Sequence, residues 1–314
     1  MKLSIIAPVF NEEDSLQLLY SAVREVLDPL KIGWEIIFVD DGSTDQSLAI
    51  LTNLAKTDRH RVRVVVLQRN YGQTAAIAAG IDHAGGDIIV LIDADMQNEP
   101  SDIPLLLAKL DEGYDVVSGW RKNRQDNLLT RTIPSRIANG LISWATGVHL
   151  HDYGCTLKAY RREVISGFRL YGEMHRFIPV YAHAAGAKII EIAVKHNPRK
   201  YGKSNYGFER IFKVVLDLFT VKFLMSFAAK PIYLFGGVGI GVMLISVLLF
   251  LFLAVRRIFF AVSILGSPFF QISVMLFVLG FQSILMGLIA ELLMRTYHES
   301  QGKSTYTIRE VING

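Results

Sequence analysis

The stretch LIDADMQNEP, residues 91–100, ends an aliphatic run with two aspartates that are one residue apart. A carboxylate beside a buried strand costs free energy unless a cation, a ligand or hydrogen bonds compensate it. Asp93 and Asp95 occupy alternate positions, so at a strand end their side chains can point the same way. The stretch is therefore expected to end a buried strand at a binding site.

The sequence around this stretch alternates between strand and helix patterns. Helical patterns cover residues 12–27, 44–56, 72–84 and 102–113, and apolar runs typical of strands cover residues 3–10, 34–41, 62–68, 87–95 and 115–120. Continuous apolar strands separated by helices predict an α/β fold whose parallel sheet is covered on both faces. Ligands of such sheets bind beyond the carboxyl ends of the strands, where we expect Asp40, Asp41, Asp93, Asp95 and Arg121.

The C-terminal third is far more apolar than the rest. The 314 residues are 51% hydrophobic, and the mean hydropathy is +0.32. Residues 231–255 and 267–290 carry no charge, and each run is long enough to cross a bilayer core of roughly 20 residues. Buried helices of a soluble core usually show a polar stripe. We therefore expect a transmembrane hairpin, with spans at about 231–255 and 268–291.

These patterns divide the chain into four expected segments. An α/β domain occupies residues 1–205, amphipathic helices lying in the membrane interface occupy 206–229, and the two spans lie within 230–294. Residues 295–314 form a C-terminal tail. The N-terminus does not resemble a signal peptide, and the single cysteine, Cys155, fits a reducing compartment. The α/β domain and the tail are therefore expected in the cytosol, on a multi-pass protein of the plasma or inner membrane.

The net charge of +4 comes with basic clusters that suit nucleic acid, anionic lipid or a phosphorylated substrate. Two membrane spans favour lipid or phosphate, and we expect no nucleic-acid partner. A dinucleotide-binding glycine loop is absent after the first strand. The segment YGKS, residues 201–204, lacks the leading glycine of a phosphate-binding loop, because Asn197 stands in its place. With both glycine loops excluded, a diphosphate could still bind through Mg²⁺ or Mn²⁺ held by acidic residues.

Five segments carry a resemblance to a known family: SIIAPVFNEE, VDDGSTD, RNYGQTAAIAAG, LIDADMQNEP and RKYGKSNY. In this order they resemble the family-2 glycosyltransferases with the GT-A fold. More narrowly, the chain resembles the polyprenyl-phosphate glycosyltransferases, which include dolichol-phosphate mannose synthases and bacterial bactoprenol glucosyltransferases. The two-span hairpin resembles the bactoprenol branch.

The resemblance implies roles for particular residues. Asp93, Asp95 and Gln97 would hold the metal. The nucleotide-sugar donor would also contact Pro8, Asn11, Glu12, Asp40, Asp41, Arg199, Lys203 and Ser204. The phosphate of the lipid acceptor would contact Arg121, Arg131 and Ser135, with Arg136 as an alternative to Arg131. Asp95, Asp152 and Arg121 are the expected catalytic residues.

The expected activity is metal-dependent, inverting transfer of a hexose, glucose from UDP-glucose by the subgroup resemblance, to undecaprenyl phosphate. Three alternatives stay open. The chain could use GDP-mannose, as dolichol-phosphate mannose synthases do. It could be a processive polysaccharide synthase, although no Arg-Trp dipeptide of the Q-x-x-R-W motif occurs. It could also be an inactive membrane protein that binds sugar nucleotides. The sequence leaves a homo-oligomer open.

Overall fold

The structure is a computed structural model. It describes residues 2–122, 139–140, 142–144, 146–166, 170, 174–198, 232–260, 263–300 and 306–313. The chain forms two compact units. Unit 1 contains residues 1–221 and 304–314, and unit 2 contains residues 222–303. The expected interfacial helices at 206–229 lie outside the described residues.

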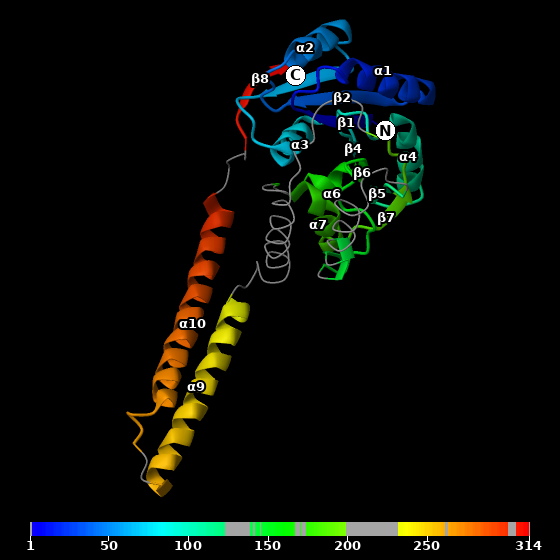
Figure 1. Cartoon of the computed structure of the whole chain (residues 1–314). Coiled ribbons are helices and arrows are strands. Elements are labelled where there is room, and N and C mark those ends of the chain that lie inside the picture. Colours follow the sequence, from blue (N-terminus) through cyan, green and yellow to red (C-terminus); the bar gives the residue numbers. More distant parts are fainter. Residues whose placement is uncertain are drawn as a thin grey trace. The chain divides into compact units, whose positions relative to one another are not determined.

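Unit 1 is built on a mixed, mostly parallel sheet (Figure 1). Within the described residues the sheet has eight strands, in the order β7-β5-β6-β4-β1-β2-β3-β8. Their bounds are β1 Lys2–Val9, β2 Gly33–Asp40, β3 Val62–Leu67, β4 Ile88–Leu91, β5 Val116–Trp120, β6 Lys158–Arg161, β7 Ile189–Ala193 and β8 Ile308–Ile312. Strands β6 and β8 run antiparallel to their neighbours, and the other pairs are parallel. The expected parallel α/β architecture is confirmed.

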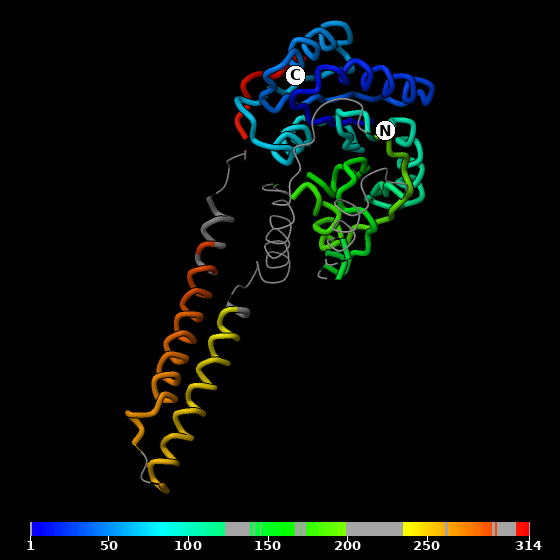
Figure 2. The backbone as a smooth tube through the Cα atoms, viewed as in Figure 1, coloured from blue at the N-terminus to red at the C-terminus, as the bar shows by residue number. Residues whose placement is uncertain are grey.

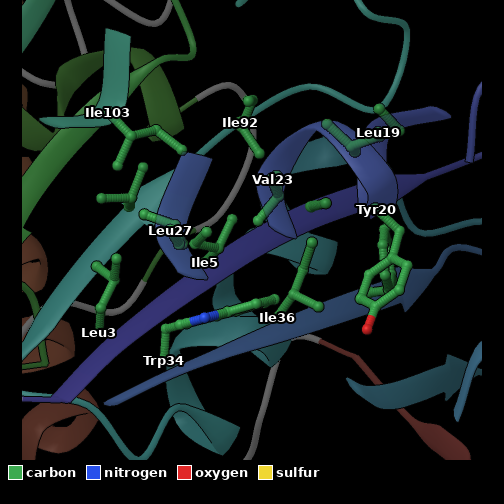
Figure 3. Close-up of a cluster of buried hydrophobic side chains, with 14 of the residues drawn as sticks. Leu3, Ile5, Leu19, Tyr20, Val23, Leu27, Trp34, Ile36, Ile92 and Ile103 are labelled. Carbon is green, nitrogen blue, oxygen red and sulfur yellow. The ribbon is translucent and has the colours of Figure 1, made fainter. Parts of the chain in front are cut away.

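Helices cover both faces of the sheet, as the continuous apolar strands predicted. Their bounds are α1 Leu16–Leu27, α2 Ser47–Thr57, α3 Gln73–His83, α4 Ile103–Asp111, α6 Arg162–Ile165 and α7 Ile178–Ala184. Figure 3 shows Leu19 and Val23 of α1 packed towards Ile5 and Ile36 of the sheet, and all four are fully buried. Helix α3 packs on the other face so closely that a Cβ on Gly80 would overlap the Ile6 side chain.

The sheet gains its last strand from the very end of the chain. Strand β8, drawn red in Figures 1 and 2, pairs antiparallel with β3. The hydroxyl of Tyr306 donates a 2.6 Å hydrogen bond to Asp82 of α3, and the amide of Asn313 donates to the carbonyls of Ala55 and Val62. Within the segment 295–314 that the sequence analysis treated as a tail, Ile308–Ile312 is therefore an edge strand of the sheet.

Unit 2 is a helical hairpin formed by α9, Ile232–Phe260, and α10, Pro268–Ser300. Within the described residues, both helices contain a stretch long and apolar enough to cross a membrane, Phe235–Phe260 and Pro268–Ala290. The expected spans agree with these helices, although α10 continues nine residues beyond residue 291, to Ser300.

Glycine allows close contact between the two hairpin helices. A Cβ on Gly239 would lie 2.6 Å from the carbonyl oxygen of Gly280. The hydroxyl of Ser246 also donates a 2.6 Å hydrogen bond to the carbonyl of Ser273. Small residues and interhelical hydrogen bonds are the usual means of packing helices in lipid. Gly239 thus provides this close helix contact, whereas a Cβ on Gly237 or Gly241 would meet nothing within 4 Å.

Candidate functional site

The loops after β1 and β2 are held together at the carboxyl edge of the sheet. Asn11 has a left-handed backbone, with φ of 57°, which asparagine tolerates better than most residues. Its amide oxygen accepts a 2.8 Å hydrogen bond from the Thr44 backbone, and its own N–H donates to Ser43 Oγ at 3.0 Å. The N–H of Glu12 donates to Ser47 Oγ at 2.9 Å. The predicted donor residues Asn11 and Glu12 therefore lie beside the end of β2.

Asp40 and Asp41 follow one another at the end of β2 but have different surroundings. Both are buried, and burial raises the pKa of each carboxyl. Asp41 accepts hydrogen bonds from the backbone N–H groups of Tyr71 and Gly72, at 2.7 and 2.8 Å. Asp41 thereby shapes the loop before α3. Asp40 accepts a longer 3.3 Å hydrogen bond from the Ser43 backbone, and the positive charge of Arg309 in β8 offsets part of the rise in its pKa.

The paired aspartates lie in the turn after β4, because that strand ends at Leu91 rather than at residue 95. Burial and the negative charge of Asp95 raise the pKa of Asp93 to about 6. Asp93 also accepts a 2.8 Å hydrogen bond from the side-chain amide of Gln73, at the start of α3. Asp95 accepts a 3.1 Å hydrogen bond from the backbone of Gln97. The turn, rather than strand alternation, brings the two carboxylates together.

The chemistry of this turn fits a divalent cation. The charge of Asp95 helps to raise the pKa of Asp93. A positive ion shared by the two carboxylates would offset this repulsion. Within the part of the chain that the structure describes, no group of three or more His, Cys, Asp or Glu side chains gathers around one point. Mg²⁺ commonly binds through one or two carboxylates, and substrate phosphates complete its coordination. Asp93 and Asp95 are the described residues that suit this role.

Arg121 and Asp152 form a buried ion pair next to the acidic turn. The Arg121 Nε and one Nη donate to the two Asp152 oxygens at 2.7 and 2.9 Å. Burial alone would lower the pKa of the Arg121 guanidinium, but the hydrogen bonds to Asp152 outweigh it and raise the pKa. The charge of Arg121 also offsets part of the rise in the pKa of Asp93. The structure thus brings Arg121, Asp152 and Asp93 into one electrostatic cluster.

Glu191 of β7 holds the Asp152 loop in place. Its carboxylate accepts 3.0 Å hydrogen bonds from the backbone N–H groups of His151 and Asp152, and it lies 2.7 Å from His151 Nδ1. The His151 ring stacks on Trp120, with 4.4 Å between ring centroids. Sequence reasoning missed Glu191, because its partners lie about 40 residues away along the chain.

The sequence analysis missed two further residues beside the site, Lys158 and Gln73. Lys158 of β6 is buried, and its ammonium donates to the carbonyls of Tyr153 and Cys155. Burial lowers the pKa of Lys158. Gln73, described above, stands in the segment RNYGQTAAIAAG, and its position at the start of the predicted helix 72–84 was the one sequence feature that could have marked it.

The structure places Pro8 on β1, paired with Val39 of β2 at the same edge of the sheet. Arg131, Ser135 and Arg136, predicted for the acceptor, lie outside the described residues. The same holds for the predicted donor residues Arg199, Lys203 and Ser204.

Comparison with known proteins identifies relatives along the whole chain. Residues 4–168 match the family model described as Glycosyl transferase family 2. The chain is 41% identical to the dodecaprenyl-phosphate galacturonate synthase of Rhizobium johnstonii, over 100% of this chain and 94% of that protein. It is 38% identical to the undecaprenyl-phosphate 4-deoxy-4-formamido-L-arabinose transferase of Proteus mirabilis, over 99% of this chain and 94% of that protein.

A solved structure with the same fold is glucosyl-3-phosphoglycerate synthase from Mycobacterium tuberculosis, in complex with Mn²⁺, UDP and phosphoglyceric acid. The TM-score is 0.54 at 17% identity, over 71% of this chain and 78% of that one. This likeness shows the fold alone, and it agrees with the GT-A architecture expected from the sequence.

Proposed function

The chain belongs to glycosyl transferase family 2, and on that premise we propose that this enzyme transfers a sugar from a nucleotide-sugar donor to the phosphate of a polyprenyl lipid. The observation that carries the proposal is the joint presence of the Asp93–Asp95 turn and the Arg121–Asp152 pair at one edge of the sheet. The turn suits a metal-bound diphosphate, and the arginine suits a second phosphate. The relatives named above act on polyprenyl phosphates, which supports this acceptor.

In the proposed site, separate sets of residues bind the nucleotide, the metal ion and the lipid phosphate. Asp40, Asn11 and Glu12 border the nucleotide, and Pro8 contributes to the same edge. Asp93 and Asp95, with Gln97 beside them, would hold Mg²⁺ or Mn²⁺, which when bound offsets charge on the leaving diphosphate. Arg121 binds the lipid phosphate, and Asp152 orients Arg121. Asp152, expected to be catalytic, is therefore a positioning residue in this proposal.

The reaction needs no strong base. A phosphate oxygen of the lipid attacks the anomeric carbon, the bond from that carbon to the donor diphosphate breaks, and the nucleoside diphosphate leaves. The attacking phosphate is already ionised near neutral pH, since its second pKa is about 6. Displacement from the opposite side inverts the anomeric centre. Holding two negatively charged substrates in line is then the main catalytic task.

The proposed location follows from the two apolar helices of unit 2. They would anchor the enzyme in the plasma or inner membrane as a hairpin, with the catalytic unit in the cytosol, where nucleotide sugars are made. The lipid acceptor would then reach the site from the bilayer.

Two variants test the proposal. Asp95→Asn should lower sugar transfer to undecaprenyl phosphate about 100-fold or more, because it removes a carboxylate that offsets developing charge. Asp111→Asn, at an exposed position at the end of α4, is the matched control. Transfer is followed by thin-layer chromatography of radiolabelled product. Full activity of Asp95→Asn would remove the metal assignment.

The same assay identifies the sugar. UDP-glucose is the donor that the sequence resemblance implied, whereas the relatives are named for galacturonate and 4-deoxy-4-formamido-L-arabinose. The screen therefore contains the UDP derivatives of all three sugars, with GDP-mannose as a fourth donor. We expect the galacturonate donor to be preferred, because the relative named for it is 41% identical along the whole chain.

A further inference from the structure

Helix α10 carries a glutamine deep within its candidate membrane span. Gln282 lies eight residues before Ala290, where the span ends, so about 12 Å of helix separates it from that end. The distance to Pro268, at the other end, is longer still. The glutamine side chain, with two methylene groups, is too short to bring its amide to the membrane surface from this depth. Under the proposed anchoring, Gln282 therefore needs hydrogen-bond partners within the lipid.

The hairpin of unit 2 does not supply these partners. Helices α9 and α10 run side by side (Figure 1), and the hydroxyls of Ser246 and Ser283 donate hydrogen bonds to the carbonyls of Ser273 and Phe235 on the opposite helix, at 2.6 and 2.8 Å. Gln282 is exposed, and among the described residues no group is hydrogen-bonded to its amide. It follows the buried Ser273 by nine residues, which is about two and a half helical turns. Gln282 thus lies on the side of α10 that faces away from α9.

Gln282 belongs to a line of exposed residues on this outer side of α10. The α10 stripe consists of Gln271, Met275, Val278, Gln282, Leu285 and Ile289, all of which are exposed. They follow one another at intervals of four and three residues, which is the spacing that keeps one side of a helix against a parallel partner helix. The stripe contains two amides, about three turns apart. The outer side of α9 is different, because every exposed residue from Phe235 to Arg256 is apolar or glycine. Lipid suits the α9 side, whereas the α10 stripe suits a partner that can hydrogen-bond.

We propose that the α10 stripe pairs with the same stripe of a second copy of this chain, and that the two Gln282 amides hydrogen-bond to each other across this contact. Copies of one protein enter the membrane in the same orientation, so their α10 helices run parallel and their Gln282 residues lie at equal depth. An amide has both donors and an acceptor, so two identical amides satisfy each other. A polar residue in such a seam also fixes the register of the two helices. The inference rests on the proposed membrane anchoring and does not depend on the reaction.

Cysteine cross-linking of the full-length protein in its membranes tests the contact. Val278→Cys lies on the α10 stripe. Leu279→Cys is the matched control, because the two residues are neighbours at the same depth and are 46% and 48% exposed, while Leu279 lies about 100° further around the helix. With copper phenanthroline as the oxidant, Val278→Cys should form several times more disulfide-linked dimer than Leu279→Cys. The wild type, whose Cys155 is buried, serves as the blank.

A second measurement tests the amide pair. Sedimentation equilibrium of the full-length protein in density-matched detergent gives the dissociation constant of the dimer. Gln282→Leu should raise this constant about five- to tenfold, because leucine keeps the apolar contact and loses the interhelical hydrogen bonds. Gln271→Leu is the matched control. It makes the same chemical change on the same stripe, only three residues inside the span, where the amide can reach the membrane surface, and it should change the constant little.

Several results would overturn the inference. One is a protein that stays monomeric in detergent and forms no dimer through Val278→Cys. Equal cross-linking of Val278→Cys and Leu279→Cys is another, since it would indicate random collisions in the membrane. A cross-linked product whose mass reveals a different protein would assign the stripe to another partner, and an unchanged or tighter dimer of Gln282→Leu would remove the amide pair. Failure of the wild type to transfer any screened sugar would refute the proposed function alone, because neither measurement uses a substrate.

Discussion

At the scale of single residues, the negative charges of Asp93 and Asp95, which suit a metal ion, lower the stability of the fold at neutral pH. The pKa of Asp93 rises from 3.8 in an ordinary environment to about 6 in the fold. The folded protein therefore binds more protons than the unfolded chain between these values, so stability falls as the pH rises through this window. At pH 7 the full cost is present, on the order of 1–3 kcal/mol.

Asp93→Asn is thus expected to raise the Tm at pH 7 in EDTA, while sugar transfer is lost. The gain in Tm should shrink as the pH is lowered from about 6 towards 4, because the folded protein then binds a proton at Asp93, which removes the cost of the buried charge. Calorimetry of the detergent-purified protein at several pH values checks this, with Asp111→Asn as the control. A lower Tm for Asp93→Asn at pH 7 would show that the carboxylate stabilises the fold.

The residues that sequence reasoning found and those that it missed differ in how they are held. Asp40, Asp93 and Arg121 stand at or just beyond strand ends, so the rule for ligand positions in parallel sheets located them. Glu191 acts through partners that are distant in the sequence, His151 and Asp152, and no local pattern marks it.

At the scale of elements, the two helices of unit 2 approach each other closely where Gly239 meets Gly280. Gly239 faces the Gly280 backbone, whereas a Cβ on Gly241 would meet nothing within 4 Å. Gly239→Val should therefore force α9 and α10 apart and lower the Tm in detergent by several degrees, and Gly241→Val should leave it nearly unchanged. Equal effects of the two valines on thermal unfolding would show that the helices do not rely on this contact.

Strand β8 shows where element prediction from sequence fails. The segment IREVI has only five residues, carries two charges and follows a long apolar helix, so its pattern is weak compared with those of β1 or β2. It becomes a strand because β3 would otherwise leave an unpaired edge. Strands β1 to β5 and the two hairpin helices, in contrast, were predicted because their apolar patterns are uninterrupted, whereas β6 and β7 were missed like β8.

At the scale of the whole molecule, the sheet constrains how the chain crosses a membrane. Strands β1 and β8 belong to one sheet, so under the proposed anchoring the residues before and after unit 2 lie on the same side of the bilayer. That requires an even number of crossings, in agreement with the two candidate spans among the described residues. The loop between the spans, which contains Leu265, should face the opposite side.

Cysteine labelling in intact cells tests this arrangement. Leu265→Cys, at a residue that is 78% exposed, should react with a membrane-impermeant maleimide. Glu25→Cys and Glu310→Cys should react only after the cells are permeabilised. The native Cys155 is buried and should give little background. Labelling of Glu25→Cys and Glu310→Cys from opposite sides would contradict the shared sheet.

The return of the chain to its first sheet also sets an order for biosynthesis. The ribosome makes β3 early, and the strand that covers its edge appears only after α10. Between these two events, both candidate spans are translated. The sheet of unit 1 can therefore be completed only after both apolar helices have been made, and under the proposed anchoring this couples completion of the catalytic unit to membrane insertion.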